Sequence, residues 1–336
     1  MTTTAAVQPI FAAIIKPICS ALVAILGTFT NTLSLSYFIS NPEKRDLDFL
    51  LMLLNGFDLV VCISAFLVGA FYQIDLNIFN YENLPLRYAM NISIDLFTAA
   101  IQCTGFATCI LSSTRLILFW NPFLQINKLA IKIAVGIYVA FMIIITITIN
   151  ILGYIVYKDN KATLPIVGWW SQVLDSANLF LLLVLVFLCS VVTLILLAKK
   201  NHDTTPGDTA FRDAATTVFI LSVLFCVLNS LYIIAPLMCI TTPEKLMSCE
   251  IDSTRDWLMT WIALPLNSAL NPIIYFSRSG NMRLYLRKTV GKITSRFGAR
   301  NGYTSGETEH TLMLNSTHAG SCHPTPPPSH MEMQKN

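Results

Sequence analysis

The chain is built from long apolar runs that hold almost no charged residue and are separated by short polar segments. Each run is about as long as the helix needed to cross roughly 30 Å of hydrocarbon. A membrane supplies no water to backbone N–H and C=O groups, and runs this uniformly apolar are unlike barrel strands, so we expect helices. The runs predict seven spans: residues 17–42, 49–74, 96–114, 133–157, 176–198, 214–243 and 257–277.

The last span differs from the others because it carries Pro265, Pro272 and several polar side chains. Proline removes a backbone hydrogen bond and kinks a helix, so the freed carbonyls must find side chains of adjacent helices or waters. Beyond this span, apolar residues recur at helical spacing among arginines and lysines. Residues 278–297 are therefore predicted to form an amphipathic helix on the inner membrane surface. Its apolar positions are Met282, Leu286, Val290 and Ile293.

Composition agrees with a membrane protein. Of 336 residues, 54% are hydrophobic and only 12% are charged, which is far too apolar for a soluble globular chain. The net charge of +3 is small, and no nucleic-acid partner is expected. The sequence shows no pairing of a nucleophile with a base, no metal motif and no phosphate-binding loop, so an enzyme is not predicted. The expected fold is an all-α bundle of seven transmembrane helices with a short amphipathic eighth helix.

The lysines and arginines indicate the orientation, because these residues concentrate in cytoplasmic loops. If the C-terminus is cytoplasmic, the outer segments hold only six of the 22. These six are Lys16, Arg87, Lys158, Lys161, Lys245 and Arg255. Residues 1–16 are therefore expected to be extracellular, residues 17–277 to form the transmembrane domain, and the protein to reside in the plasma membrane.

The two ends of the chain and one cysteine pair complete this picture. Residues 1–8 carry no positive charge before the first apolar run, so the first span is expected to be its own anchor. Residues 298–336 are rich in Ser, Thr, Gly and Pro and predict a disordered cytoplasmic tail. Cys239 and Cys249 flank a short outer loop in an oxidising compartment, where they are either bridged or free.

Asp58 lies near the middle of the second span. An uncompensated charge at that depth costs about 2.5–3.5 kcal/mol on insertion scales. The carboxyl group must therefore have polar partners or be protonated.

The segments 271–275, Asn-Pro-Ile-Ile-Tyr, and 54–59, which contains Asp58, are two short motifs in these spans. They resemble the seventh-helix motif and the second-helix acidic motif of rhodopsin-like G-protein-coupled receptors. Asn31 is similar to the first-helix asparagine, and Arg115 followed by Pro122 is similar to the inner end of the third helix. The resemblance implies that an extracellular ligand signal is passed to a cytoplasmic heterotrimeric G protein. The residues implied in activation and coupling are Asn31, Arg115, Asn271, Pro272 and Tyr275.

The resemblance also implies a sodium site. Asp58, Thr104, Ser268 and Asn271, with Asn267 beside them, resemble the pocket in which many relatives bind a sodium ion. Oxygen ligands suit such a hard cation. The alternative is a cluster of hydrogen bonds and waters around a neutral Asp58.

Other positions depart from the family pattern. Thr114 stands where the family has an acid before the arginine, and Leu116 where it has an aromatic residue, so Arg115 could instead be an interfacial arginine that reaches lipid phosphates. Met90 occupies the position of a usual cysteine, and 225–229 lacks the usual aromatic switch residue and proline. Phe97 and Pro265 replace the acid of amine receptors and the lysine of retinal-binding relatives.

The expected function is therefore a receptor for a peptide or small molecule, and not a retinal opsin or a typical amine receptor. One alternative is an ion-coupled transporter or channel, in which Asp58 would hold the coupling ion or proton. The other is a receptor that binds its ligand without coupling, because of Thr114 and the altered sixth helix.

Overall fold

The computed structural model describes residues 16–40, 48–78, 84–121, 127–159, 164–199, 216–230, 232–233 and 262–300. Within these ranges the regular secondary structure is entirely helical. The helices are α2 (Lys16–Ser40), α3 (Asp48–Ile78), α4 (Leu84–Trp120), α5 (Lys128–Asp159), α6 (Leu164–Lys199), the unlabelled helix Thr216–Ser230, α9 (Leu264–Arg278) and α10 (Gly280–Arg300).

Five of these helices are long and apolar enough to cross a membrane, which confirms the first five predicted spans. The apolar spans are Ile18–Ser40, Asp48–Phe71, Ala89–Trp120, Lys128–Leu152 and Leu174–Lys199. They indicate a multi-pass membrane protein.

The predicted sixth and seventh spans are described only in part. The helix Thr216–Ser230 and α9 each contain 15 residues. At 1.5 Å per residue, such a helix is about 22 Å long, which is less than the hydrocarbon thickness of a bilayer. Residues 234–243 and 257–261 of these two spans lie outside the described residues.

Many large apolar side chains of α5 point away from the other helices. Ile133, Ile137, Phe141, Ile144 and Ile151 follow one another at helical spacing, and all are exposed. A continuous stripe of this kind would be unfavourable in water but suits contact with lipid chains.

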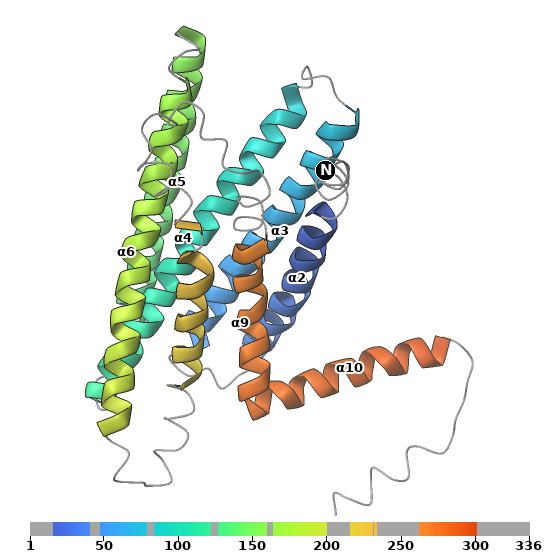
Figure 1. The fold of residues 1–336 in the computed structure, drawn as a ribbon. Helices are drawn as coiled ribbons and strands as arrows, with labels where there is room; N and C mark the ends of the chain where they lie inside the picture. Colours follow the sequence, from blue (N-terminus) through green and yellow to red (C-terminus); the bar gives the residue numbers. More distant parts are fainter. Residues whose placement is uncertain are drawn as a thin grey trace, which may run out of the picture. The chain divides into compact units, whose positions relative to one another are not determined.

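Helix packing brings distant parts of the sequence together. In Figure 1, α9 lies beside α2, and it packs against both α2 and α3. In turn, α3 packs against α4, and α4 packs against α5 and α6. The helices approach one another closely at Gly27, where an added Cβ would overlap Sγ of Cys62 on α3 and crowd Ala269 on α9. Only glycine lets three helix backbones come this close.

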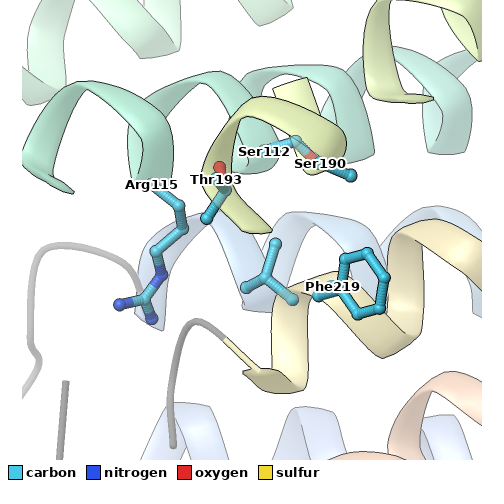
Figure 2. Close-up of a pocket in the computed structure, with 6 residues that line it drawn as sticks. Ser112, Arg115, Ser190, Thr193 and Phe219 are labelled. Atoms are coloured by element: carbon cyan, nitrogen blue, oxygen red, sulfur yellow. The ribbon is translucent and has the colours of Figure 1, made fainter. Parts of the chain in front are cut away.

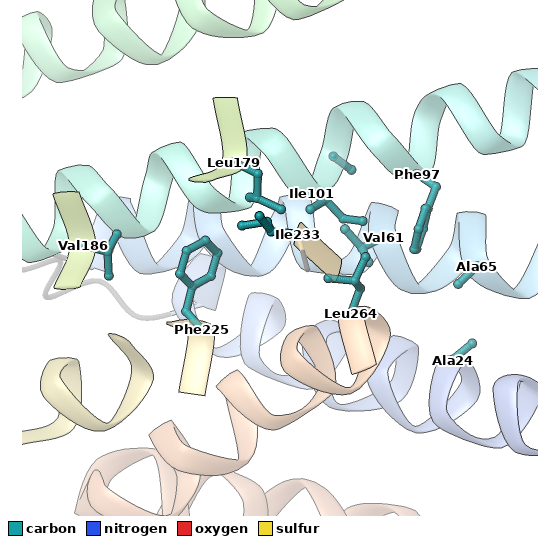
Figure 3. Close-up of a cluster of buried hydrophobic side chains, with 11 residues drawn as sticks. Ala24, Val61, Ala65, Phe97, Ile101, Leu179, Val186, Phe225, Ile233 and Leu264 are labelled. Atoms are coloured by element: carbon teal, nitrogen blue, oxygen red, sulfur yellow. The ribbon is translucent and has the colours of Figure 1, made fainter. Parts of the chain in front are cut away.

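The buried side chains form two apolar clusters with a polar layer between them along α2, α3, α4 and α9. The first cluster, shown in Figure 3, gathers around Phe97, Leu179 and Phe225. The second gathers around Leu54, Leu111 and Tyr275. Its members include Phe38, Leu50, Ala107, Val218, Leu221, Phe276 and Met282.

The packing divides the chain into two units, Met1–Leu286 and Arg287–Asn336. The first turns of α10 belong to the first unit, where Met282 is buried in the second apolar cluster and the ring of Tyr285 meets the edge of Tyr37. In the second unit, residues 287–300 continue α10, and Arg287, Lys288 and Lys292 are exposed. The helix reaches Arg300, three residues beyond the predicted end at residue 297.

Candidate functional site

The polar layer is centred on the carboxylate of Asp58, which is completely buried. Its Oδ1 accepts hydrogen bonds from Thr104 Oγ1 at 3.2 Å and from Ser268 Oγ at 2.8 Å. Its Oδ2 accepts a hydrogen bond from Asn271 Nδ2 at 2.7 Å. Three donors from α4 and α9 thus converge on one acid from α3. The structure brings together all four residues of the predicted sodium site.

Asn31 joins this layer through the backbone of α9. Pro272 has no N–H, so the carbonyl of Ser268, four residues earlier, cannot receive its usual helical hydrogen bond. Asn31 Nδ2 donates to that carbonyl at 3.0 Å, and also to the carbonyl of Gly27 at 2.9 Å. Thr30 Oγ1 donates to the next carbonyl, that of Ala269, at 3.3 Å. The carbonyl freed by Pro272 is therefore satisfied by a neighbouring helix, as the proline pattern predicted.

Pro265 is the second residue of α9 and lies in its first turn. The two residues before α9, Ile262 and Ala263, are wound as a π-helix. Pro272 is the proline inside the helix.

Oxygen atoms dominate the layer. The amide oxygens Oδ1 of Asn31 and Asn267 are buried and accept no hydrogen bond from any described residue. Together with the Asp58 carboxylate and the lone pairs of the Thr104 and Ser268 hydroxyls, they form a set of neutral and anionic oxygens. This chemistry fits a hard monovalent cation such as sodium, and it equally fits buried waters, which bind to such orphaned polar atoms. Among the described residues, no group of three or more His, Cys, Asp and Glu side chains forms a site for a transition metal.

Arg115 lies at the other end of α4 from Leu84, beside a small cavity of about 10 Å³, which is room for about one water molecule. Figure 2 shows Arg115 and Phe219 on opposite sides of this cavity, which lies between α4, α6 and the helix Thr216–Ser230. Ser112, Ser190, Thr193 and Val218 complete its lining. We call this end of the bundle the Arg115 end.

Three of the six residues that line the Arg115 cavity carry hydroxyl groups, and two of these hydroxyls are bonded within α6. Ser190 Oγ donates to Val186 O at 2.7 Å, and Thr193 Oγ1 donates to Cys189 O at 2.7 Å, both within α6. Because each of these two hydroxyls already donates its hydrogen, it can only accept further hydrogen bonds from other groups. Thr114, the neighbour of Arg115, is buried.

Tyr275, the last residue of the 271–275 motif, is buried in the second apolar cluster. Its hydroxyl group has no hydrogen-bond partner among the described residues. Asn271 and Pro272 occupy the polar layer one turn away on the same helix. The motif thus links the polar layer to the Arg115 end of α9.

A second polar network joins α4, α5 and α6, and the sequence analysis did not identify it. Asn178 Nδ2 donates to Gln102 Oε1 at 2.9 Å and to Tyr138 OH at 2.7 Å. Gln102 Nε2 donates to the backbone oxygen of Asp175 at 2.8 Å, and Tyr138 stacks on Phe106 with ring centroids 4.0 Å apart. A polar residue in each of three apolar spans was the available signal. Such residues in a membrane commonly hydrogen-bond across helices.

Some residues of the sequence predictions lie outside the described residues. These are Cys239 and Cys249, the candidate disulfide pair, and Pro122, which follows Arg115 in the family motif.

No protein-family model matches this chain, and no curated protein matches it either.

Proposed function

We propose that this protein is a seven-helix receptor of the rhodopsin-like type, which passes an extracellular ligand signal to a cytoplasmic heterotrimeric G protein. The observation that carries the proposal is the polar layer. Residues from four motifs far apart in the sequence meet in it: Asn31, Asp58, Thr104, and Ser268 with Asn271. Such a convergence is expected if the resemblance in each motif has one common origin.

The proposal includes two membrane spans beyond the five long helices. The helix Thr216–Ser230 would form the main part of the sixth span, and α9 the inner part of the seventh. An odd number of spans puts the two termini on opposite sides of the membrane, and the lysines and arginines favour an extracellular N-terminus and a cytoplasmic C-terminus. The Arg115 end is then the cytoplasmic end.

In this receptor, the polar layer supplies the two-state element. A buried network of neutral donors around one carboxylate can rearrange, whereas close-packed apolar clusters shift only between discrete arrangements. A ligand at the outer helix ends would favour one arrangement, and α9 would transmit the change from Asn271 to Tyr275. Arg115 and Tyr275 would then help to open the cytoplasmic end to the G protein.

Asp58 would also hold an allosteric sodium ion, with oxygens from Thr104, Ser268 and Asn271 around it. We expect Asp58→Asn to abolish the response to sodium with little effect on surface expression, because asparagine keeps the size and removes the charge that retains a cation.

The first test is a ligand-library screen in cells that express this chain with a promiscuous G protein. Once an agonist is found, its affinity is measured in sodium and in a larger organic cation. The parent should differ between the two salts and Asp58→Asn should not. Ser64→Ala is a control, because Ser64 is a buried polar residue of α3 outside the Asp58 contacts. Equal affinities in both salts for the parent would favour the cluster with a neutral Asp58.

A transporter or channel is the competing function, and the buried acid Asp58 is the observation that favours it. Membranes that carry the protein can be tested for both activities. Current or uptake without agonist-stimulated nucleotide exchange would replace the receptor proposal. Ligand binding with neither activity would indicate a receptor that does not couple, which Thr114 beside Arg115 makes the third possibility.

A further inference from the structure

The helix Thr216–Ser230 packs against the rest of the protein through one of its faces. Leu221, Ser222, Phe225 and Asn229 recur at helical spacing and are buried, whereas Ile220, Val223 and Val227 on the opposite side are exposed. Phe225 lies deep in the first apolar cluster, and Gly105 of α4 leaves room for its ring, because an added Cβ would be 3.2 Å from Phe225 Cζ. The contact between this helix and α4 is therefore apolar around Phe225.

One turn closer to the Arg115 end, the contact becomes polar. The hydroxyl oxygens of Ser112 on α4 and Ser222 lie 3.0 Å apart, and the two residues are only 2% and 0% exposed. Ser112 also lines the cavity beside Arg115, together with Val218 of the helix Thr216–Ser230. Separating the two serines would therefore widen this cavity next to the arginine.

The two serines have an alternative partner in their own helices. A serine in a helix can donate to the carbonyl four residues earlier, as Ser190 does to Val186 O at 2.7 Å. For Ser112 and Ser222 these carbonyls belong to Thr108 and Val218. Each hydroxyl can thus exchange a bond across helices for a bond within its helix, and neither is left unsatisfied when the helices part.

We propose that Ser112 and Ser222 form a neutral clasp, which holds the helix Thr216–Ser230 against α4 in the resting receptor and opens without stranding a buried polar group. This inference rests on the proposed function, because it describes what restrains the cytoplasmic end of that receptor. The start of the helix Thr216–Ser230 is also held by α9, because Arg278 Nε donates an exposed hydrogen bond to Thr217 Oγ1 at 3.2 Å.

The experiment removes each hydroxyl in the full-length protein in membranes. Ser112→Ala, Ser222→Ala and the double variant are compared with Ser190→Ala. That serine is also buried and lines the same cavity, but it donates within its own helix. Two properties are measured without ligand: nucleotide exchange on an added G protein, and the distance between labels on unnatural amino acids at positions 117 and 220, both exposed.

We expect each clasp variant to raise ligand-free exchange about threefold, the size that corresponds to an average hydrogen bond between transmembrane helices. The label distance should shift to longer values. The double variant should match the single variants, since either change removes the same bond. Ser190→Ala should behave as the parent, and Ser222→Thr, which keeps a hydroxyl, should restore parental behaviour.

The outcomes separate the clasp from the proposed function. Unchanged distances in all clasp variants overturn the clasp, whether or not the protein couples. Longer distances in the clasp variants without any G-protein response, even with agonist, support the clasp and contradict the proposed function. Additive effects of the two single variants would show that the serines act independently and would also overturn the clasp.

Discussion

At the scale of single residues, the missing backbone N–H of Pro272 explains the position of Asn31. Pro272 leaves the carbonyl of Ser268 without a helical donor, and Asn31 supplies one from α2. An unpaired carbonyl in a buried layer is costly, so the proline and the asparagine depend on each other. The asparagine thereby fixes α2 to the part of α9 just before Pro272.

Asn31→Leu should therefore lower the thermal stability of the detergent-solubilised protein. Leucine has a similar size but leaves the Ser268 carbonyl without its donor, a loss of about 1–2 kcal/mol by comparison with model transmembrane peptides. Asn229→Leu is the matched control, because Asn229 is equally buried and its amide donates to Phe225 O in its own helix. A larger loss in the control than in Asn31→Leu, measured as the melting midpoint, would contradict this account.

The sequence identified the members of the polar layer but not their partners. Asp58, Thr104, Ser268 and Asn271 stand out as polar residues in apolar spans, and the resemblance grouped them. The bond from Asn31 to the Ser268 carbonyl follows from the proline only when the two helices are known to touch. The clasp between Ser112 and Ser222 depends on the rotation of each helix about its axis. A long apolar run in the sequence predicts a helix but not this rotation.

At the scale of elements, the apolar runs of the sequence located the five long helices but underestimated the lengths of four of them, α3 to α6. The third predicted span begins at residue 96, whereas α4 begins at Leu84 and includes Asp95. Helical hydrogen bonds continue past the hydrocarbon edge, where charged residues are tolerated. The carboxylate of Asp95 is also satisfied by Asn150 Nδ2 of α5 at 2.8 Å. A charged residue can therefore indicate where a helix leaves the hydrocarbon region of the membrane without indicating where the helix ends.

Because Gly27 is closely packed and Gly136 is not, we predict that alanine has opposite effects on stability at these two glycines. Alanine in place of an exposed helical glycine stabilises by roughly 0.5–1 kcal/mol, because glycine loses more backbone freedom on folding. This should hold for Gly136→Ala on α5, where an added Cβ meets nothing within 4 Å. Gly27→Ala should instead destabilise by about 1–3 kcal/mol, since its Cβ would overlap Cys62 Sγ and push α2 from α3. Melting midpoints that rise for both variants would show that α2 can move at no cost.

The basic helix α10 is expected to bind the anionic inner leaflet. Between Gly280 and Arg300 the sequence has no acidic residue, and Arg283, Arg287, Lys288 and Lys292 are exposed. Each such cation near an anionic membrane surface contributes about 1 kcal/mol. Val290 is exposed on the opposite side of the helix from Lys288. A helix that lies in the interface would bury one of these positions and leave the other in water.

Spin labels at positions 288 and 290 test this in vesicles that contain anionic lipid. The label at 290 should be accessible to oxygen dissolved in the lipid, and the label at 288 to a water-soluble relaxation agent. Neutral vesicles should reduce the difference. If both labels are as water-accessible as a label beyond Gly302, α10 does not bind the membrane.

At the scale of the whole molecule, a polar layer separates two apolar clusters, and this sets what can move. Apolar clusters that pack around Phe225 and Tyr275 shift as units, because dense packing does not deform continuously. The layer around Asp58 can exchange hydrogen-bond partners at lower cost. A change at one end of the bundle is therefore expected to reach the other end through α9, which contributes to the layer and to both clusters.

If the proposed function is correct, the restraint at the Arg115 end is expected to set how often the receptor is active without ligand. In the family that the motifs resemble, the acid before the arginine pairs with it in the resting state, and a partly buried ion pair resists separation because each charge would be stranded. Thr114 offers a hydroxyl and no charge. The contact between Ser112 and Ser222 at this end is neutral as well, so we expect the resting state of the proposed receptor to be weakly held. Since about 1.4 kcal/mol changes an equilibrium tenfold, even a modest loss of restraint gives measurable basal signalling.

We predict that Thr114→Asp lowers ligand-free nucleotide exchange while ligand binding persists, because the new carboxylate can pair with the neighbouring guanidinium and add a charged restraint to the resting state. Thr114→Asn is the control for size and hydrogen bonding, and it should leave basal exchange near that of the parent. Exchange is measured in membranes matched for receptor density, with and without agonist. Equal or higher basal exchange in the aspartate variant would show that Arg115 is not the restrained group. No exchange in any variant, even with agonist, would favour a receptor that binds its ligand without coupling.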